Sequence, residues 1–114
     1  MSFKHDHIHI TTQDVDDWVK FYVDNMGATI TSTVESFGVK MVNVDAGGAM
    51  LRISNMTGVE KQLSKQTGSD VKPPEGYHHI GFLTENVDAA MDDLVSKGAK
   101  IEVPAADASP TLRC

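Results

Sequence analysis

The chain contains an internal repeat, and this feature limits its fold more than any other. DHIHITTQDVDDWVKFYV, which begins at Asp6, matches HHIGFLTENVDAAMDDLV, which begins at His78, at an offset of 72 residues. Such self-similarity predicts two related structural units that pack together and share a core. The identities at this offset are His7 with His79, Ile8 with Ile80, Thr12 with Thr84, Val15 with Val87, Asp16 with Asp88, and Val23 with Val95.

The first copy predicts a βαβββ module. Residues 3–10 alternate as a half-buried strand does, and the apolar residues from Val15 to Met26 recur at the spacing of a helix packed on one face. Asp14 is the expected N-cap of this helix, and Gly27 is expected to end it. Three more strands are expected over residues 28–35, 39–45 and 49–54.

The second copy predicts a strand over 77–83, a helix that begins after Asn86, and a strand over 99–103. Two strands of the first module have no counterpart in it. The predicted fold class is therefore α+β, with paired βαβββ modules that form a curved mixed sheet and a second module truncated after its second strand.

This pattern predicts one shared fold in three parts. The first βαβββ module covers residues 1–58, and the incomplete second module covers 77–114. The linker over 59–76 can form a short helix at Val59 to Gln66, whereas Pro73-Pro74 prevents regular structure just before the next strand.

Strand alternation predicts that the two repeated histidines share one face. Ile8 and Ile80 should pack beneath their helices, because they neighbour the histidines and point the other way. His7 and His79 should then line the concave face of the sheet. Tyr77 is expected on that face too, either as a hydrogen-bond donor to a ligand or as a core residue.

Composition excludes several classes of partner. The net charge of −6 without a cluster of basic residues disfavours nucleic acid. No apolar run reaches the roughly 20 residues of a membrane span, and no signal peptide is recognisable, which predicts a cytoplasmic protein. The only cysteine is Cys114, so neither a disulfide nor a cysteine-based metal site is expected.

A repeated βαβββ module with a histidine in each first strand resembles the vicinal oxygen chelate superfamily, which includes glyoxalase I, methylmalonyl-CoA epimerase, extradiol dioxygenases and bleomycin and fosfomycin resistance proteins. The arrangement is most similar to methylmalonyl-CoA epimerase and glyoxalase-like members. The matching stretches are DHIHITTQDVDDWVKFYVDNMGA, GVKMVNVDAGGAMLRIS and GYHHIGFLTENVDAAMDDLVSKGAKI.

The resemblance implies a site for a divalent metal such as Zn, Ni, Co, Mn or Fe. Metal-dependent relatives take a His from the first strand and a Glu or Gln from the fourth strand of each module. His7 and His79 match the two histidines. The first Glu/Gln position falls on Arg52, which cannot ligate a metal and would repel one, and the second has no counterpart here.

Other polar residues have two interpretations each. Arg52 either packs its stem while its head reaches water, or binds a substrate anion. His9 can contact substrate, although His5, His7 and His9 together extend too far along one strand, about 13 Å, to share one ion. Glu35 is either a general base beside the concave face or an exposed edge residue.

Two functional hypotheses follow. The first is a metal-assisted lyase or isomerase that acts through an enediolate on a small substrate with vicinal oxygens. The alternative is a metal-free binding or resistance-type protein with Arg52 as an anion contact. In both, the open edge of the incomplete module predicts a homodimer or a domain-swapped assembly.

Overall fold

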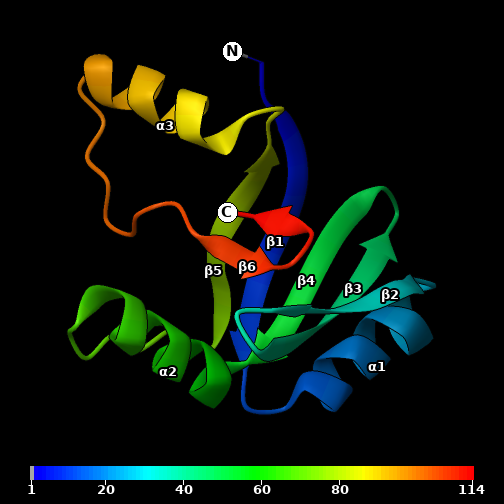
Figure 1. The fold of residues 1–114 in the computed structure, drawn as a ribbon. Coiled ribbons are helices and arrows are strands. Elements are labelled where there is room, and N and C mark those ends of the chain that lie inside the picture. Colours follow the sequence, from blue (N-terminus) through cyan, green and yellow to red (C-terminus); the bar gives the residue numbers. More distant parts are fainter. Residues whose placement is uncertain (1) are drawn as a thin grey trace.

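The computed structural model describes residues 2–114 as a five-stranded mixed sheet with three helices and a small hairpin (Figure 1). Strand order in the sheet is β2-β3-β4-β1-β5, with β1 parallel to β4 and the other pairs antiparallel. The predicted α+β class is confirmed. The elements are β1 (Lys4–Thr12), α1 (Val15–Met26), β2 (Thr29–Ser36), β3 (Val39–Ala46), β4 (Ala49–Asn55), α2 (Met56–Thr67), β5 (Gly76–Leu83), α3 (Val87–Ser96), β6 (Asp107–Ser109) and β7 (Leu112–Arg113).

The first module forms as its sequence pattern predicts. Its apolar alternation buries Ile10 of β1 and Ile53 of β4 against Val19 of α1, so that α1 covers one face of the sheet. Gly27 ends α1 in the left-handed conformation at φ 67°, and its N–H donates to the Tyr22 carbonyl. This packing leaves the opposite face of the sheet free for other elements.

Helix α2 lies on that opposite face. Its Val59 packs with Val39 and Met41 of β3 in a second, smaller apolar cluster. The helix begins at Met56, ahead of the expected start, because the Asn55 side chain accepts hydrogen bonds from the N–H groups of Thr57 and Gly58. No helix within residues 2–114 combines the length and apolar character needed to cross a membrane.

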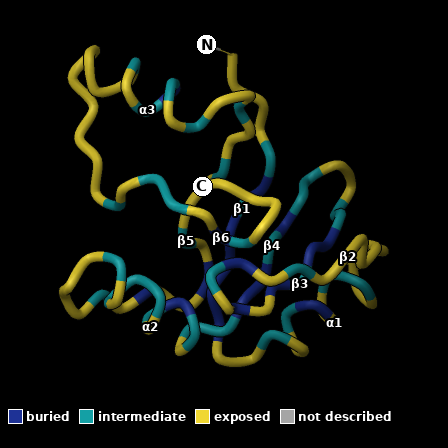
Figure 2. Tube along the Cα trace, viewed as in Figure 1, coloured by how far each residue is buried: buried dark blue, intermediate teal, exposed yellow. Residues whose placement is uncertain are grey.

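The second copy does not reproduce the packing of the first. Strand β5 pairs with β1 at the sheet edge, but α3 buries only Ala90 among its residues and stands away from the sheet (Figures 1 and 2). Ile80 keeps 44% of its surface exposed, so the expectation that it packs beneath a helix is wrong. In the first module α1 packs on β3 and β4, which follow it, whereas the strands that follow α3 within residues 2–114, β6 and β7, form a separate hairpin.

The predicted strand over residues 99–103 is also absent. In the first module the corresponding strand, β2, pairs with β3, whereas within residues 2–114 no strand equivalent to β3 lies beside residues 99–103. The chain instead returns over the face opposite α1 and forms the β6–β7 hairpin (Figure 1). The Phe37 N–H donates to the Ala108 carbonyl at 2.9 Å, and Arg113 pairs with Asp88 of α3 at 2.9 Å.

Candidate functional site

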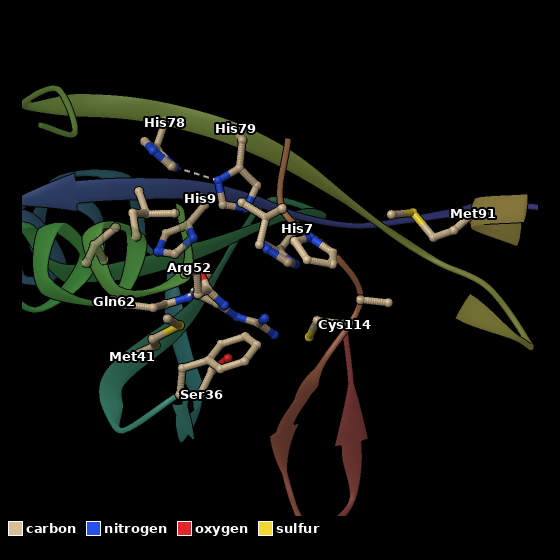
Figure 3. A pocket seen from close by; sticks show the side chains of 17 residues that line it. His7, His9, Ser36, Met41, Arg52, Gln62, His78, His79, Met91 and Cys114 are labelled. Atoms are coloured by element: carbon tan, nitrogen blue, oxygen red, sulfur yellow. Dashed lines mark hydrogen bonds between the residues drawn. The ribbon is translucent and has the colours of Figure 1, made fainter. Parts of the chain in front are cut away.

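A pocket of about 330 Å³ opens on the face of the sheet opposite α1 (Figure 3). Strands β1, β4 and β5 form its floor, α2 forms one wall, and the C-terminal segment forms the other. Its lining residues are His7, His9, Ser36, Phe37, Met41, Arg52, Val59, Gln62, Leu63, Gln66, His78, His79, Met91, Val103, Pro104, Ala105 and Cys114.

Three histidines in this pocket form a candidate metal site. The ligand atoms of His7, His9 and His79 all lie within 4.8 Å of one another. Strand register brings them together: His9 is directly opposite His79 in the β1–β5 pair, and His7 is two residues along β1. The expected placement of His7 and His79 on one face is confirmed, and His9, expected as a substrate contact, joins the same cluster. His5 lies outside it, with its ring against Phe82.

Gly81 makes room for the ring of His7. The two residues are paired across β1 and β5, and a Cβ atom at Gly81 would lie 2.7 Å from Nε2 of His7. Any side chain there would therefore displace the imidazole. A glycine inside an apolar strand is the sequence signal for this close approach, although the alternation of β5 alone predicts only the face on which Gly81 lies.

Each cluster histidine has a hydrogen-bond partner. Nδ1 of His7 lies 2.7 Å from Oδ2 of Asp6. Because an ionised carboxylate only accepts, His7 donates from Nδ1 and keeps a lone pair on Nε2. Nε2 of His9 lies 2.6 Å from Oγ of Ser54, and Nδ1 of His79 lies 2.6 Å from Nδ1 of His78.

The surroundings keep these imidazoles neutral. Burial lowers the pKa of His9 to about 3, with smaller contributions from the neighbouring histidines and Arg52. Burial also lowers the pKa of His79 to about 4, helped by His78 and His7. For His7, burial lowers the pKa although Asp6 opposes the shift. At neutral pH the cluster therefore offers lone pairs, and three neutral imidazoles fit a first-row divalent ion.

Arg52 supplies the positive charge of the pocket. Its side chain is 18% exposed and extends into the cavity (Figure 3). Nε donates to Oδ1 of Asn43 at 3.0 Å, and Nη2 lies 3.7 Å from Oδ2 of Asp6. These contacts leave most guanidinium N–H groups free of a close protein acceptor, as an anion-binding arginine requires.

Two residues that the sequence offered as possible site residues, Glu35 and Tyr77, lie outside the pocket. Glu35 is exposed on β2 and does not line the pocket, although its neighbour Ser36 does. Tyr77 pairs with Ile10, on the α1 side, and is 62% exposed, so its expected placement on the concave face is wrong. A β-bulge at His78 causes this reversal, because one extra residue switches the alternation. His78 lines the pocket instead.

Among the described residues, no Asp or Glu side chain lines the pocket. Asp6 is the nearest acidic group by contact, and its oxygen is directed at His7 and Arg52. The side chains in the lining that can accept a proton at neutral pH are therefore the imidazoles, because burial raises the pKa of the Cys114 thiol and keeps it protonated. The pocket is thus better suited to binding a metal and an anion than to carboxylate base catalysis.

Comparison with protein families gives one match. The family model described as Glyoxalase/Bleomycin resistance protein/Dioxygenase superfamily matches residues 4–112. It covers both copies of the repeat and confirms the resemblance inferred from the sequence. No significantly similar sequence is found among curated proteins.

Solved structures with a similar fold include methylmalonyl-CoA epimerases. A variant of the Streptomyces coelicolor enzyme in complex with 2-nitronate-propionyl-CoA is 28% identical, with a TM-score of 0.58, over 85% of this chain and 73% of that one. A further epimerase with methylmalonyl-CoA and NH4+ is 28% identical, with a TM-score of 0.59, over 88% and 73%. The Mycobacterium tuberculosis enzyme has a TM-score of 0.68 at 17% identity, over 96% and 74%.

Proposed function

Because the chain belongs to the glyoxalase/bleomycin resistance protein/dioxygenase superfamily, we propose that it is a metal-assisted enzyme of the isomerase or lyase type. Its substrate is a small anion with two neighbouring oxygen atoms. The observation that carries this proposal is the meeting of His7, His9 and His79 within 4.8 Å in one pocket with Arg52.

The three imidazoles of His7, His9 and His79 would hold a divalent ion as neutral donors. When bound, such an ion supplies a Lewis acid for substrate oxygens. Three protein ligands leave coordination positions open, as catalytic metal sites do. The apolar wall formed by Met41, Val59 and Leu63 excludes water from this side of the pocket and strengthens polar contacts inside it.

Arg52 selects an anionic substrate. A guanidinium binds a carboxylate through two parallel hydrogen bonds. Two similar structures carry 2-nitronate-propionyl-CoA and methylmalonyl-CoA, and methylmalonyl-CoA has a carboxylate beside a thioester carbonyl. A cavity of about 330 Å³ suits the acyl group of such a thioester, with the remainder extending into solvent.

A second candidate is a metal-free binding protein of the resistance type. The observation that favours it is the charge of the pocket: Arg52 occupies a position where metal-dependent relatives have an oxygen ligand, and no Asp or Glu side chain of the described residues lines the cavity. In this candidate Arg52 and the histidines bind an anionic ligand, and no bond is broken.

Metal content and proton exchange separate the two candidates. Purified protein should take up one Co2+ per chain, and the His7→Ala and His79→Ala variants should lose it. His5→Ala, from the same strand but outside the cluster, is the matched control and should bind normally. With metal present, the C2 hydrogen of methylmalonyl-CoA should exchange with D2O, followed by NMR.

Two results would exclude the enzyme candidate: wild-type protein that binds Co2+ no better than His7→Ala, or a metal-loaded protein that leaves the C2 hydrogen in place across a panel of acyl-CoA carboxylates. Binding of malonate that is lost only in Arg52→Gln would then support the second candidate.

A further inference from the structure

We infer that Asp6 and His78 are positioning residues that set which ring nitrogen of His7 and of His79 faces the metal. The inference rests on the proposed metal site and goes beyond it. It assigns roles to two residues that supply no ligand atom. It also makes the two repeated histidines unequal, because Asp6 fixes the tautomer of His7 in every state, whereas the tautomer of His79 depends on whether metal is bound.

Asp6 and His78 occupy equivalent positions in the internal repeat. At the offset of 72 residues Asp6 aligns with His78, just as His7 aligns with His79. In both copies the residue before the repeated histidine contacts Nδ1 of that histidine, at 2.7 Å in the first copy and 2.6 Å in the second. The position is the same, but the chemistry of the partner differs.

In the first copy the partner is a carboxylate. It can only accept, so the hydrogen of neutral His7 must lie on Nδ1, and Nε2 is the ligand atom. A carboxylate in this position also raises the basicity of a ligating imidazole. Gly81 leaves the ring of His7 packed directly over the backbone, which removes other orientations. His7 is therefore ready to ligate before any metal arrives.

In the second copy the partner is another imidazole, which can donate or accept. One of the two Nδ1 atoms must carry the shared hydrogen. If His79 donates, its Nε2 has a lone pair and can ligate. If His78 donates, neutral His79 carries its hydrogen on Nε2 and cannot ligate from that atom. Metal binding therefore selects the arrangement in which His79 donates and His78 accepts.

Four variants test the inference with Co2+ as the probe. Asp6→Ala and His78→Ala remove the acceptor and should each weaken Co2+ binding about 10- to 100-fold, the usual loss for such partners. Asp6→Glu and His78→Asp supply a carboxylate, which only accepts from Nδ1, and should recover most of the affinity. His5→Ala is the matched control from β1 and should bind as wild type does.

A second readout does not need the metal. Nitrogen-15 NMR of the metal-free protein should find His7 with its hydrogen on Nδ1 in wild type and Asp6→Glu, and as a mixture of the two neutral tautomers in Asp6→Ala. His79 should populate both tautomers in metal-free wild type, and only the Nδ1–H tautomer with Zn2+ or in His78→Asp.

The outcomes separate the two proposals. If wild type binds no Co2+, the proposed metal function fails, and the tautomers of the metal-free protein still decide whether Asp6 and His78 set them. Alanine variants with wild-type affinity, or a Zn2+ form in which His79 keeps hydrogen on Nε2, would overturn the inference.

Discussion

A histidine cluster can hold a metal only while its rings are neutral, and desolvation lowers the pKa of all three rings here, although His79 keeps more exposed surface than His7 and His9. His9 is the extreme case, with a pKa of about 3 and a hydrogen bond to Ser54. The pKa of His79 is lowered to about 4. Because the unfolded chain takes up protons on these histidines near pH 6.5 and the native protein does not, acid favours unfolding.

The stability of the metal-free protein should therefore fall as pH drops from about 6.5 toward 4. Between these values the unfolded state binds more protons than the native state, so the free energy of unfolding rises with pH. Urea melts at several pH values measure the slope. His9→Gln, which cannot titrate, should flatten it, and an unchanged slope in that variant would contradict the assignment to His9.

Gly81→Ala should reduce metal binding more than it reduces the stability of the fold. The new Cβ displaces the His7 ring, so Co2+ affinity should drop at least tenfold, and the overpacking should cost about 1–3 kcal/mol of stability. Calorimetric titration and urea melts give both values. Ile80→Ala, one residue away on the exposed face, should leave Co2+ binding unchanged.

Arg52→Gln should strengthen metal binding and weaken anion binding. The change removes a cation that lies in the pocket with the three histidines and adds an amide oxygen. Titrations with Co2+ and with malonate, at fixed ionic strength, measure the two effects separately. A variant that binds both ligands as wild type does would show that the guanidinium is directed elsewhere in solution.

At the scale of elements, local pattern predicts most of what the structure contains. Strand alternation and helical stripes identify β1 to β5, α1 and α3 because each signal lies within its own segment. The predictions that were wrong depend on which strands lie next to each other. Residues 99–103 lack a neighbouring strand, and the bulge at His78 reverses Tyr77 through pairing with β1. The register that brings His9 into the cluster likewise depends on how β1 and β5 pair, which neither strand shows alone.

Helix α3 should exchange its amide hydrogens far faster than β1 or β4. It buries only Ala90, whereas the neighbouring β1–β4 region contains the core, so α3 can open without disturbing the sheet. Hydrogen exchange followed by mass spectrometry tests this at peptide resolution. Protection of α3 equal to that of β4 at low protein concentration would mean that α3 packs on the sheet in solution.

At the scale of the whole molecule, β5 is an open edge with apolar side chains around it. Ile80, Phe82 and Leu83 are exposed on β5, and Phe3 lies against Phe82. A monomer rarely leaves such a strand uncovered.

The site itself could be anticipated only in part: the repeat revealed His7 and His79, but Glu35 faces away from the pocket and His78 enters it.

We expect the protein to be a dimer at micromolar concentration. A second copy that covers β5 would bury Ile80 and Phe82, which the single chain exposes. Sedimentation velocity measures the mass, and Phe82→Asp should shift the population to monomer without loss of β-sheet signal. A folded wild-type monomer at these concentrations would contradict the expectation.

The outer wall of the pocket has a kinetic consequence. Residues 103–105 and Cys114 line the cavity on one side. On exposed surface, the Arg113–Asp88 ion pair joins the hairpin to α3 and the Arg113–Asp107 ion pair joins its two strands. Dissolved salt screens such pairs. A molecule that contacts this wall should therefore be held for a shorter time as ionic strength rises, even where the contacts on the pocket floor stay the same.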